Sequence, residues 1–61
     1  MTGLEALQKE IRAYMNAWTD DLATGGADDF PAYREAVGVI KGLALAERAL
    51  LDIQARLVSE D

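Results

Sequence analysis

Apolar side chains recur at helical spacing through the second half of this chain, and they occupy more than one helical face. One stripe comprises Tyr33, Val37, Ile40, Ala44, Leu51 and Val58. A second stripe, with unbroken spacings of four and three, comprises Val39, Leu43, Ala46, Leu50, Ile53 and Leu57. At about 100° per residue the two stripes together span about 200° of a helix. A helix that faces one neighbour and solvent needs a stripe somewhat over 100° wide, so this pattern predicts a helix with more than one neighbour.

The first half of the chain has a single apolar face. Its members recur at spacings of three and four, and they are Leu4, Leu7, Ile11, Tyr14, Trp18 and Leu22. Thr2 and Glu5 have the spacing of a capping box at a helix start. Gly25 and Gly26 can end the helix, because glycine adopts the left-handed conformation without a Cβ penalty. These signals predict a helix over about residues 3–24.

A short turn over residues 25–29 leads into the second predicted helix, over about residues 30–59. Asp28 or Asp29 is expected as its N-cap, with Pro31 in the first turn, where a missing N–H has no cost. At about 1.5 Å per residue the second helix is roughly 45 Å long and the first roughly 33 Å. The chain is therefore predicted to be all-α, a single antiparallel hairpin of two unequal helices over residues 1–61, completed by association with another chain.

The first stripe is predicted to pack against the first helix. Counted outward from the turn, Leu4 should lie opposite Leu51, and Ile53, Leu57 and Val58 should extend beyond the cover of the first helix. The expected hairpin core comprises Leu7, Ile11, Tyr14, Trp18, Tyr33, Val37, Ile40 and Leu51.

The second stripe is predicted to be the interface with a partner chain. Each large apolar side chain left in water forfeits about 1.5–3 kcal/mol relative to full burial, and a continuous exposed strip normally marks an interface. The expected interface comprises Val39, Gly42, Leu43, Ala46, Leu50, Ile53 and Leu57. The alternative is a monomer whose apolar excess is mostly alanine and is partly masked by long polar side chains.

Two further features each leave two interpretations open. Gly38 and Gly42 form a G-x-x-x-G pattern, which either lets another helix approach closely or is a tolerated irregularity that kinks the helix. Glu47 and Gln54 interrupt the apolar arc between the two stripes. They either fix the register of an interface, as buried polar residues do in coiled coils, or lie at its edge, with Glu47 reaching solvent or a basic residue.

The composition of the chain limits which kinds of partner it can bind. A chain of 61 residues is marginally stable alone, and without cysteine or histidine it has no disulfide and none of the usual zinc ligands. A net charge of −5 disfavours nucleic acid and anionic membranes as partners. The sequence has no signal peptide and no apolar run of the roughly 20 residues that span a bilayer. We expect a soluble protein, cytoplasmic or virion-associated, whose partner is another protein chain.

No group of residues predicts catalysis. A nucleophile–base pair would need Ser, Thr or Lys, and the only serine is Ser59, near the end of the chain. The acidic pairs Asp20–Asp21 and Asp28–Asp29 adjoin the turn and are typical of helix caps and solvated charge. We expect no enzymatic activity, no cofactor, no metal ion and no small-molecule substrate.

Residues 33–46 follow the pattern Y-x-x-x-V-G-x-I-x-G-L-x-x-A. This segment resembles the short helical proteins encoded among the head and packaging genes of tailed bacteriophages. The resemblance implies a structural role in a virion, at the capsid or the portal.

Three kinds of function therefore stay open. The chain is an accessory subunit of a larger assembly, a regulatory or inhibitory adaptor that binds an enzyme, or a homodimer that forms a four-helix bundle.

Overall fold

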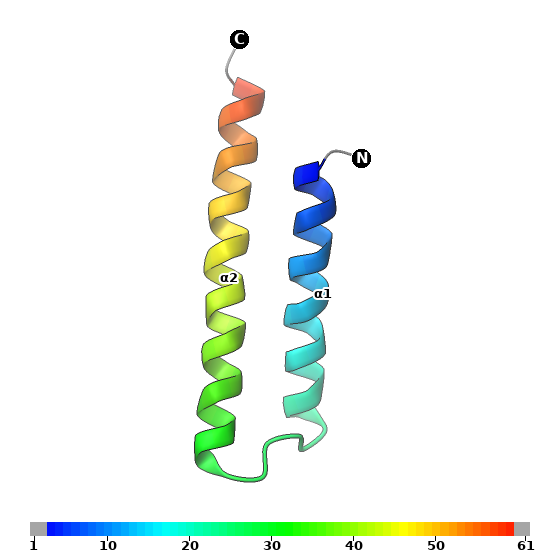
Figure 1. Cartoon of the computed structure of the whole chain (residues 1–61), viewed down its shortest axis with the longest axis vertical. Coiled ribbons are helices and arrows are strands. Elements are labelled where there is room, and N and C mark those ends of the chain that lie inside the picture. Colours follow the sequence, from blue (N-terminus) through cyan, green and yellow to red (C-terminus); the bar gives the residue numbers. More distant parts are fainter. Residues whose placement is uncertain (1–2, 60–61) are drawn as a thin grey trace.

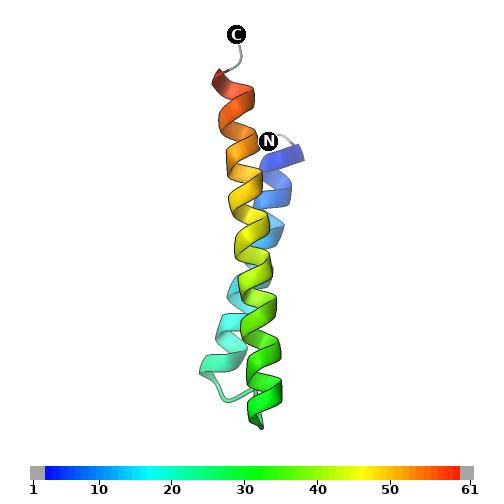
Figure 2. The same cartoon turned by 90° about the vertical axis from the view of Figure 1, so that its left-hand side faces the viewer.

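The computed structural model describes residues 3–59 and contains two α-helices, α1 (Gly3–Ala23) and α2 (Phe30–Ser59). Their bounds agree with the predicted ranges to within one residue. The helices run antiparallel, side by side in one layer, and cross at a small angle (Figures 1 and 2). The all-helical hairpin expected from the sequence is thus confirmed over these residues, with α2 as the longer helix.

Two glycines end α1 in the way that their sequence predicts. The Gly25 N–H donates to the Leu22 carbonyl at 3.2 Å and the Gly26 N–H to the Asp21 carbonyl at 2.7 Å, which is the Schellman pattern. Gly25 has a φ of 83°, a conformation that a Cβ would strain. The chain therefore leaves the helix at this point and turns toward α2.

Asp29 is the N-cap of α2. Its carboxylate Oδ1 accepts from the Ala32 N–H at 2.8 Å, and its carbonyl accepts the first helical hydrogen bond, from the Tyr33 N–H at 3.0 Å. Pro31 lies in the first turn, where no N–H partner is needed. Of the two acidic residues expected here, Asp29 takes the capping role. The predicted cap of α1 at Thr2 lies outside the described residues.

The contact between the helices is a heptad seam, meaning the set of residues that α1 and α2 turn toward each other. From α1 it takes half-buried side chains at Leu4, Gln8, Ile11, Met15 and Leu22. From α2 it takes Ala36, Ile40, Leu43, Glu47, Leu50 and Gln54, at alternating spacings of four and three. This spacing is that of an antiparallel coiled coil. Only Ala36, Glu47 and Leu50 are buried among the described residues.

The predicted hairpin core is wrong at most of its positions. Ile11 and Ile40 are half-buried as expected, but the other six side chains are exposed: Leu7, Tyr14, Trp18, Tyr33, Val37 and Leu51. Leu51 is 43% exposed, whereas its neighbour Leu50, which was expected at the partner interface, is 5% exposed. The reason is a rotation of α2 by about one residue. Its seam runs between the two apolar stripes, so it buries one edge of each and leaves their outer edges uncovered.

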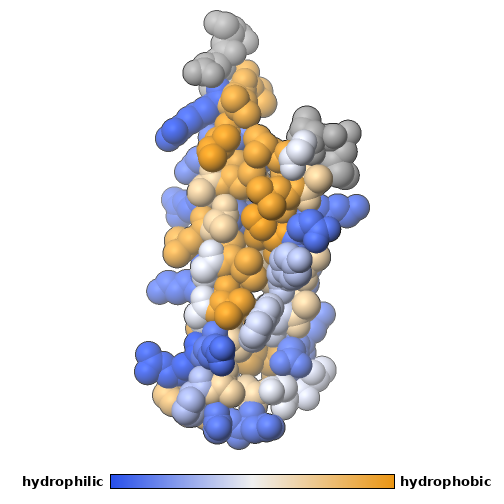
Figure 3. Space-filling view, viewed as in Figure 1, coloured by the Kyte–Doolittle hydropathy of each residue, from blue (hydrophilic) through white to orange (hydrophobic). Residues whose placement is uncertain are grey.

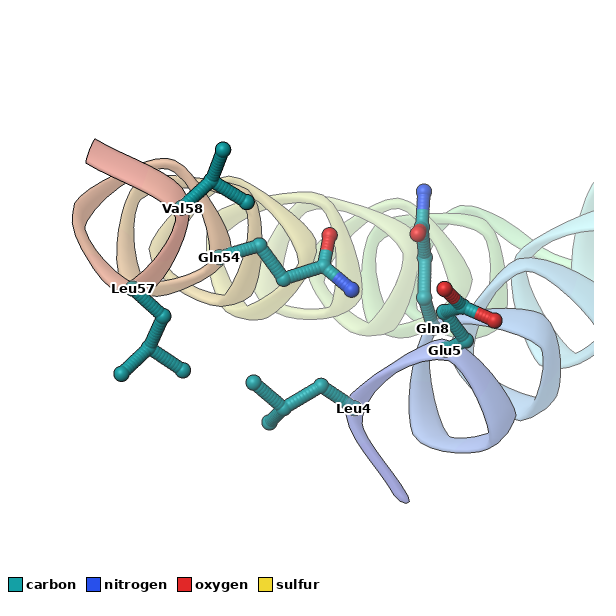
Figure 4. Close-up of a pocket in the computed structure, with 6 residues that line it drawn as sticks. All are labelled: Leu4, Glu5, Gln8, Gln54, Leu57 and Val58. Carbon is teal, nitrogen blue, oxygen red and sulfur yellow. The ribbon is translucent and has the colours of Figure 1, made fainter. Parts of the chain in front are cut away.

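The register along the helices also differs from the prediction. Leu4 lines a shared depression with Gln54, Leu57 and Val58, about one turn beyond Leu51. The shift arises because α2 begins beyond the end of α1, so α2 passes α1 at both ends (Figure 1). Leu57 and Val58 line this depression but lie past the start of α1, as expected from the sequence (Figure 4), and both are exposed.

The hairpin is elongated and exposes much of its surface. Its radius of gyration is 14.5 Å, against about 10.5 Å for a compact domain of this length. Its accessible surface is 4790 Å², against about 3,900 Å² for a compact monomer of this mass. No residue of α1 is buried. One pair of helices therefore leaves this chain without an ordinary core.

Candidate protein-binding surface

A charged contact crosses the seam near its middle. Arg12 donates from Nε to Glu47 Oε2 at 3.0 Å and from Nη2 to Glu47 Oε1, which makes a two-point ion pair. The Glu47 residue is 8% exposed, whereas more than half of the Arg12 side chain stays in water. Glu47 therefore lies inside the seam and reaches a basic residue. A charge held this way fixes the register of the hairpin, as a polar seam residue does in coiled coils.

The residues beside the seam lie on two faces of the hairpin. In α1, Leu7 and Tyr14 each follow a seam residue, Leu4 or Ile11, by three positions. In α2, the residues that follow the seam residues Ala36, Leu43 and Leu50 by three positions are Val39, Ala46 and Ile53. Because both helices are right-handed and run antiparallel, an equal offset places both sets on the same side. We name this side the apolar face, and its members are Leu7, Tyr14, Val39, Ala46 and Ile53, together with Gly42 and Ala49, which directly precede the seam residues Leu43 and Leu50. Glu10, which directly precedes Ile11, is the corresponding residue of α1 and adds one charge to this side.

The apolar face is continuous over both helices. Figure 3 shows a band of apolar side chains that follows the groove between α1 and α2. In Figure 1, seen from the same side, α2 runs upward to the left of α1. In a right-handed helix of this orientation, residues that follow the seam by three, which are Val39, Ala46 and Ile53, lie on the side nearer the viewer. Tyr14 is 56% exposed and Ile53 is 47% exposed. Large side chains from both helices are thus left in water on one side of the molecule.

The opposite face is mixed. One residue after the inward positions of α2 come Val37, Ala44, Leu51 and Val58, which are all apolar. The residues of α1 that follow its seam residues Leu4, Gln8, Ile11 and Met15 are all polar, Glu5, Lys9, Arg12 and Asn16, and Arg12 is engaged with Glu47. An apolar partner on this side would meet charged groups from α1. The apolar face is therefore the better candidate for a protein-binding surface.

The predicted interface residues separate into two groups. Leu50 is buried and Leu43 half-buried in the seam, and Val39 is half-buried beside it. Gly42, Ala46, Ile53 and Leu57 are exposed. Leu50 and Leu43 therefore hold the hairpin together, which corrects their expected role as partner contacts. Of the outward residues that remain, two are small (Gly42 and Ala46) and two are large (Ile53 and Leu57).

Both helical glycines have open space where a side chain would be. A Cβ at Gly38 or at Gly42 meets no atom within 4 Å. α2 is a single helix through both positions, so the kink that was one interpretation of this pair is not present. Gly42 lies on the apolar face, whereas Gly38 points away from α1 and lies at the outer edge of that face, in the same direction as Arg56. Gly42 is therefore the glycine nearer the middle of this face.

An open depression of about 450 Å³ lies at the end of the hairpin where α1 begins. Figure 4 shows that Leu4 and Leu57 extend into the same gap and that Gln54 reaches across it toward α1. Glu5, Gln8 and Val58 complete the lining. Its walls carry one carboxylate and two amides on a largely apolar surface, and this composition suits a protein side chain better than a charged ligand.

The described residues bring few reactive groups together. No cluster of three or more Asp or Glu side chains within residues 3–59 could hold a metal ion. Neither described helix is long and apolar enough to cross a membrane. No protein family, curated protein or solved structure matches this chain. The argument for function therefore depends on the surface itself.

Proposed function

We propose that this chain is a non-enzymatic accessory subunit that binds another protein chain through its apolar face. The observation that carries the proposal is the uncovered band on both helices, which includes Leu7, Tyr14 and Ile53. Covering each large side chain would stabilise the assembly by about 1.5–3 kcal/mol. A hairpin with three buried residues in its described part has little other source of stability, because small domains without disulfides or metals depend on association.

A bacteriophage particle is the proposed setting for this subunit. The support is the resemblance of residues 33–46 to short helical proteins of phage head and packaging genes. In that setting the apolar face would dock on a larger subunit at the capsid or the portal. A regulatory adaptor that binds an enzyme would use the same face, and the identity of the captured partner separates the two.

The test compares two equivalent substitutions on α2. Ile53→Asp puts a charge on the apolar face, and Leu45→Asp puts the same charge on the side of α2 that points away from α1. Leu45 is 62% exposed and Ile53 is 47% exposed, so neither change buries a carboxylate in the hairpin. We expect Ile53→Asp to lose both self-association and the protein captured from the native source, while Leu45→Asp retains them. Equal association by the two variants would refute the proposal.

A further inference from the structure

The uncovered side of α2 has a pattern that is nearly the same when it is read from either end. At spacings of three and four it runs Val39, Gly42, Ala46, Ala49 and Ile53. Glu35 lies four residues before this stripe and Arg56 three residues after it. Reversal about Ala46 places Val39 on Ile53, and it brings Gly42 to within one residue of Ala49 and Glu35 to within one residue of Arg56. Two such helices, side by side and antiparallel, would match small residues with small, large with large and acid with base.

We propose that the apolar face binds a second copy of the same chain. α2 then lies antiparallel to α2 of the second copy, about a two-fold axis beside Ala46, and α1 covers α1. The product is a symmetric four-helix bundle with a self-complementary interface. This inference rests on the proposed function, because it names the partner for the same surface.

The surface area supports a second copy. Each chain exposes 4790 Å², whereas a compact body of twice the 6.6 kDa mass exposes about 6,400 Å². Assembly into such a body removes roughly 3,000 Å² of accessible surface from two separate chains. This amount is within the range of about 2,000–5,000 Å² that homodimers bury. A second copy is thus large enough to bring the hairpin to ordinary compactness.

The small residues set how close the two α2 helices lie. Interaxial distances fall near the lower end of the usual 8–10 Å when the contacting side chains are small. Gly42 is within one residue of the position opposite Ala49 in the proposed pair, and Ala46 is opposite its own counterpart. The Cβ space at Gly42 is empty in the single chain. The second copy fills it and gives this glycine, which weakens an isolated helix, a packing role.

Charge complementarity fixes the direction of the second helix. No charged residue interrupts the stripe from Val39 to Ile53. Glu35 and Arg56 are at its two ends, so antiparallel pairing forms two equivalent ion pairs and parallel pairing forms none. Arg56 also has a contact within its own chain, and its five N–H donors allow it to serve both partners.

A cysteine at the axis tests the arrangement directly, since the sequence has none of its own. In the Ala46→Cys variant the two thiols lie opposite each other, within the distance that a disulfide needs. Mild oxidation should convert most of this variant to a covalent dimer. The control is Leu45→Cys, one residue away and about 100° around α2, on the side that points away from α1, which should stay largely monomeric in denaturing electrophoresis. If α2 packed instead against α1 of the second copy, the two introduced thiols would be too far apart to form a disulfide. Failure of the Ala46→Cys variant to cross-link would therefore overturn the proposal.

A charge exchange tests the ion pairs. Glu35→Arg and Arg56→Glu each replace two attractive pairs by two repulsive ones, and each should weaken self-association roughly tenfold. Mixing the two variants should restore association. In the mixed dimer the introduced arginine of one chain meets the introduced glutamate of the other, and at the opposite end the unchanged Glu35 meets the unchanged Arg56. Sedimentation equilibrium measures the dissociation constants, and equal constants for the wild type, both variants and the mixture would overturn the antiparallel pairing.

The outcomes also separate this inference from the proposed function. The wild-type chain could sediment as a monomer and still lose its captured protein when Ile53→Asp is introduced. That result would exclude a second copy as the partner but would support the proposed binding role. A chain in which Ile53→Asp changes neither mass nor capture refutes both.

Discussion

At the scale of single residues, Glu47 decides how the hairpin is assembled. Its carboxylate lies in an otherwise apolar seam and is held by the Arg12 guanidinium through two hydrogen bonds. A carboxylate that loses its partner in such a place pays the full cost of desolvation. Arg12 is largely exposed, and water therefore screens part of this interaction. The pair defines register more than it adds stability.

The Arg12–Glu47 pair gives a double-mutant prediction. Arg12→Met should lower the free energy of unfolding by about 1–3 kcal/mol, because it leaves Glu47 buried without a partner. Adding Glu47→Met should recover most of this loss, since an apolar pair in a seam is often as stable as the ion pair that it replaces. Urea unfolding at one fixed protein concentration measures both values. A double variant that is less stable than Arg12→Met would show that the carboxylate stabilises the seam by itself.

At the scale of elements, helix ends were predictable and helix rotation was not. The ends follow from local chemistry at Gly25, Gly26 and Asp29, which acts within one turn of the chain. The rotation of α2 depends on the partner helix. From the sequence, Glu47 and Gln54 were expected between the two stripes, either fixing the register of an interface or lying at its edge. The heptad of Ala36, Leu43 and Leu50, with Arg12 one residue after Ile11, was the signal for the observed arrangement.

That rotation also explains how much of the candidate site was predicted. Gly42, Ala46 and Ile53 are exposed beside the seam, as the second stripe required. Leu43 and Leu50 were expected at the partner interface but lie in the seam. The seam occupies the middle of the wide apolar arc of α2, so α1 buries the edge of the expected interface that is nearer to it. Leu7 and Tyr14 were placed in the core, since a single stripe on α1 offers no means of telling its inner edge from its outer edge.

The two glycines of α2 offer a matched comparison at this scale. Both lie inside one helix with free space for a Cβ, so alanine at either position should raise helix stability by about 0.5–1 kcal/mol. Gly38→Ala, at the outer edge of the apolar face, should therefore stabilise the protein and change association much less than Gly42→Ala. Gly42→Ala should weaken the dimer, because the added methyl separates closely packed helices. Sedimentation and thermal unfolding of both variants measure these effects, and identical behaviour would exclude a close contact at Gly42.

At the scale of the whole molecule, the hairpin is an incomplete core. α1 packs against the middle of the apolar arc of α2, and the two edges of this arc stay exposed to water. Ordinary domains have a free energy of unfolding of only about 5–15 kcal/mol. The burial energy that these exposed apolar side chains forfeit is a large fraction of that amount. Folding and association are therefore expected to be coupled, as they are in obligate homodimers.

The dependence of unfolding on protein concentration tests this coupling most directly. Helicity followed by circular dichroism during heating should show a cooperative transition, and its midpoint should rise steadily as the wild-type chain is concentrated about a hundredfold. This rise is expected because assembly stabilises the folded chain by mass action. A cooperative transition with one midpoint at every concentration, from a chain of monomeric mass, would show that the single hairpin is stable without a partner and would contradict the account.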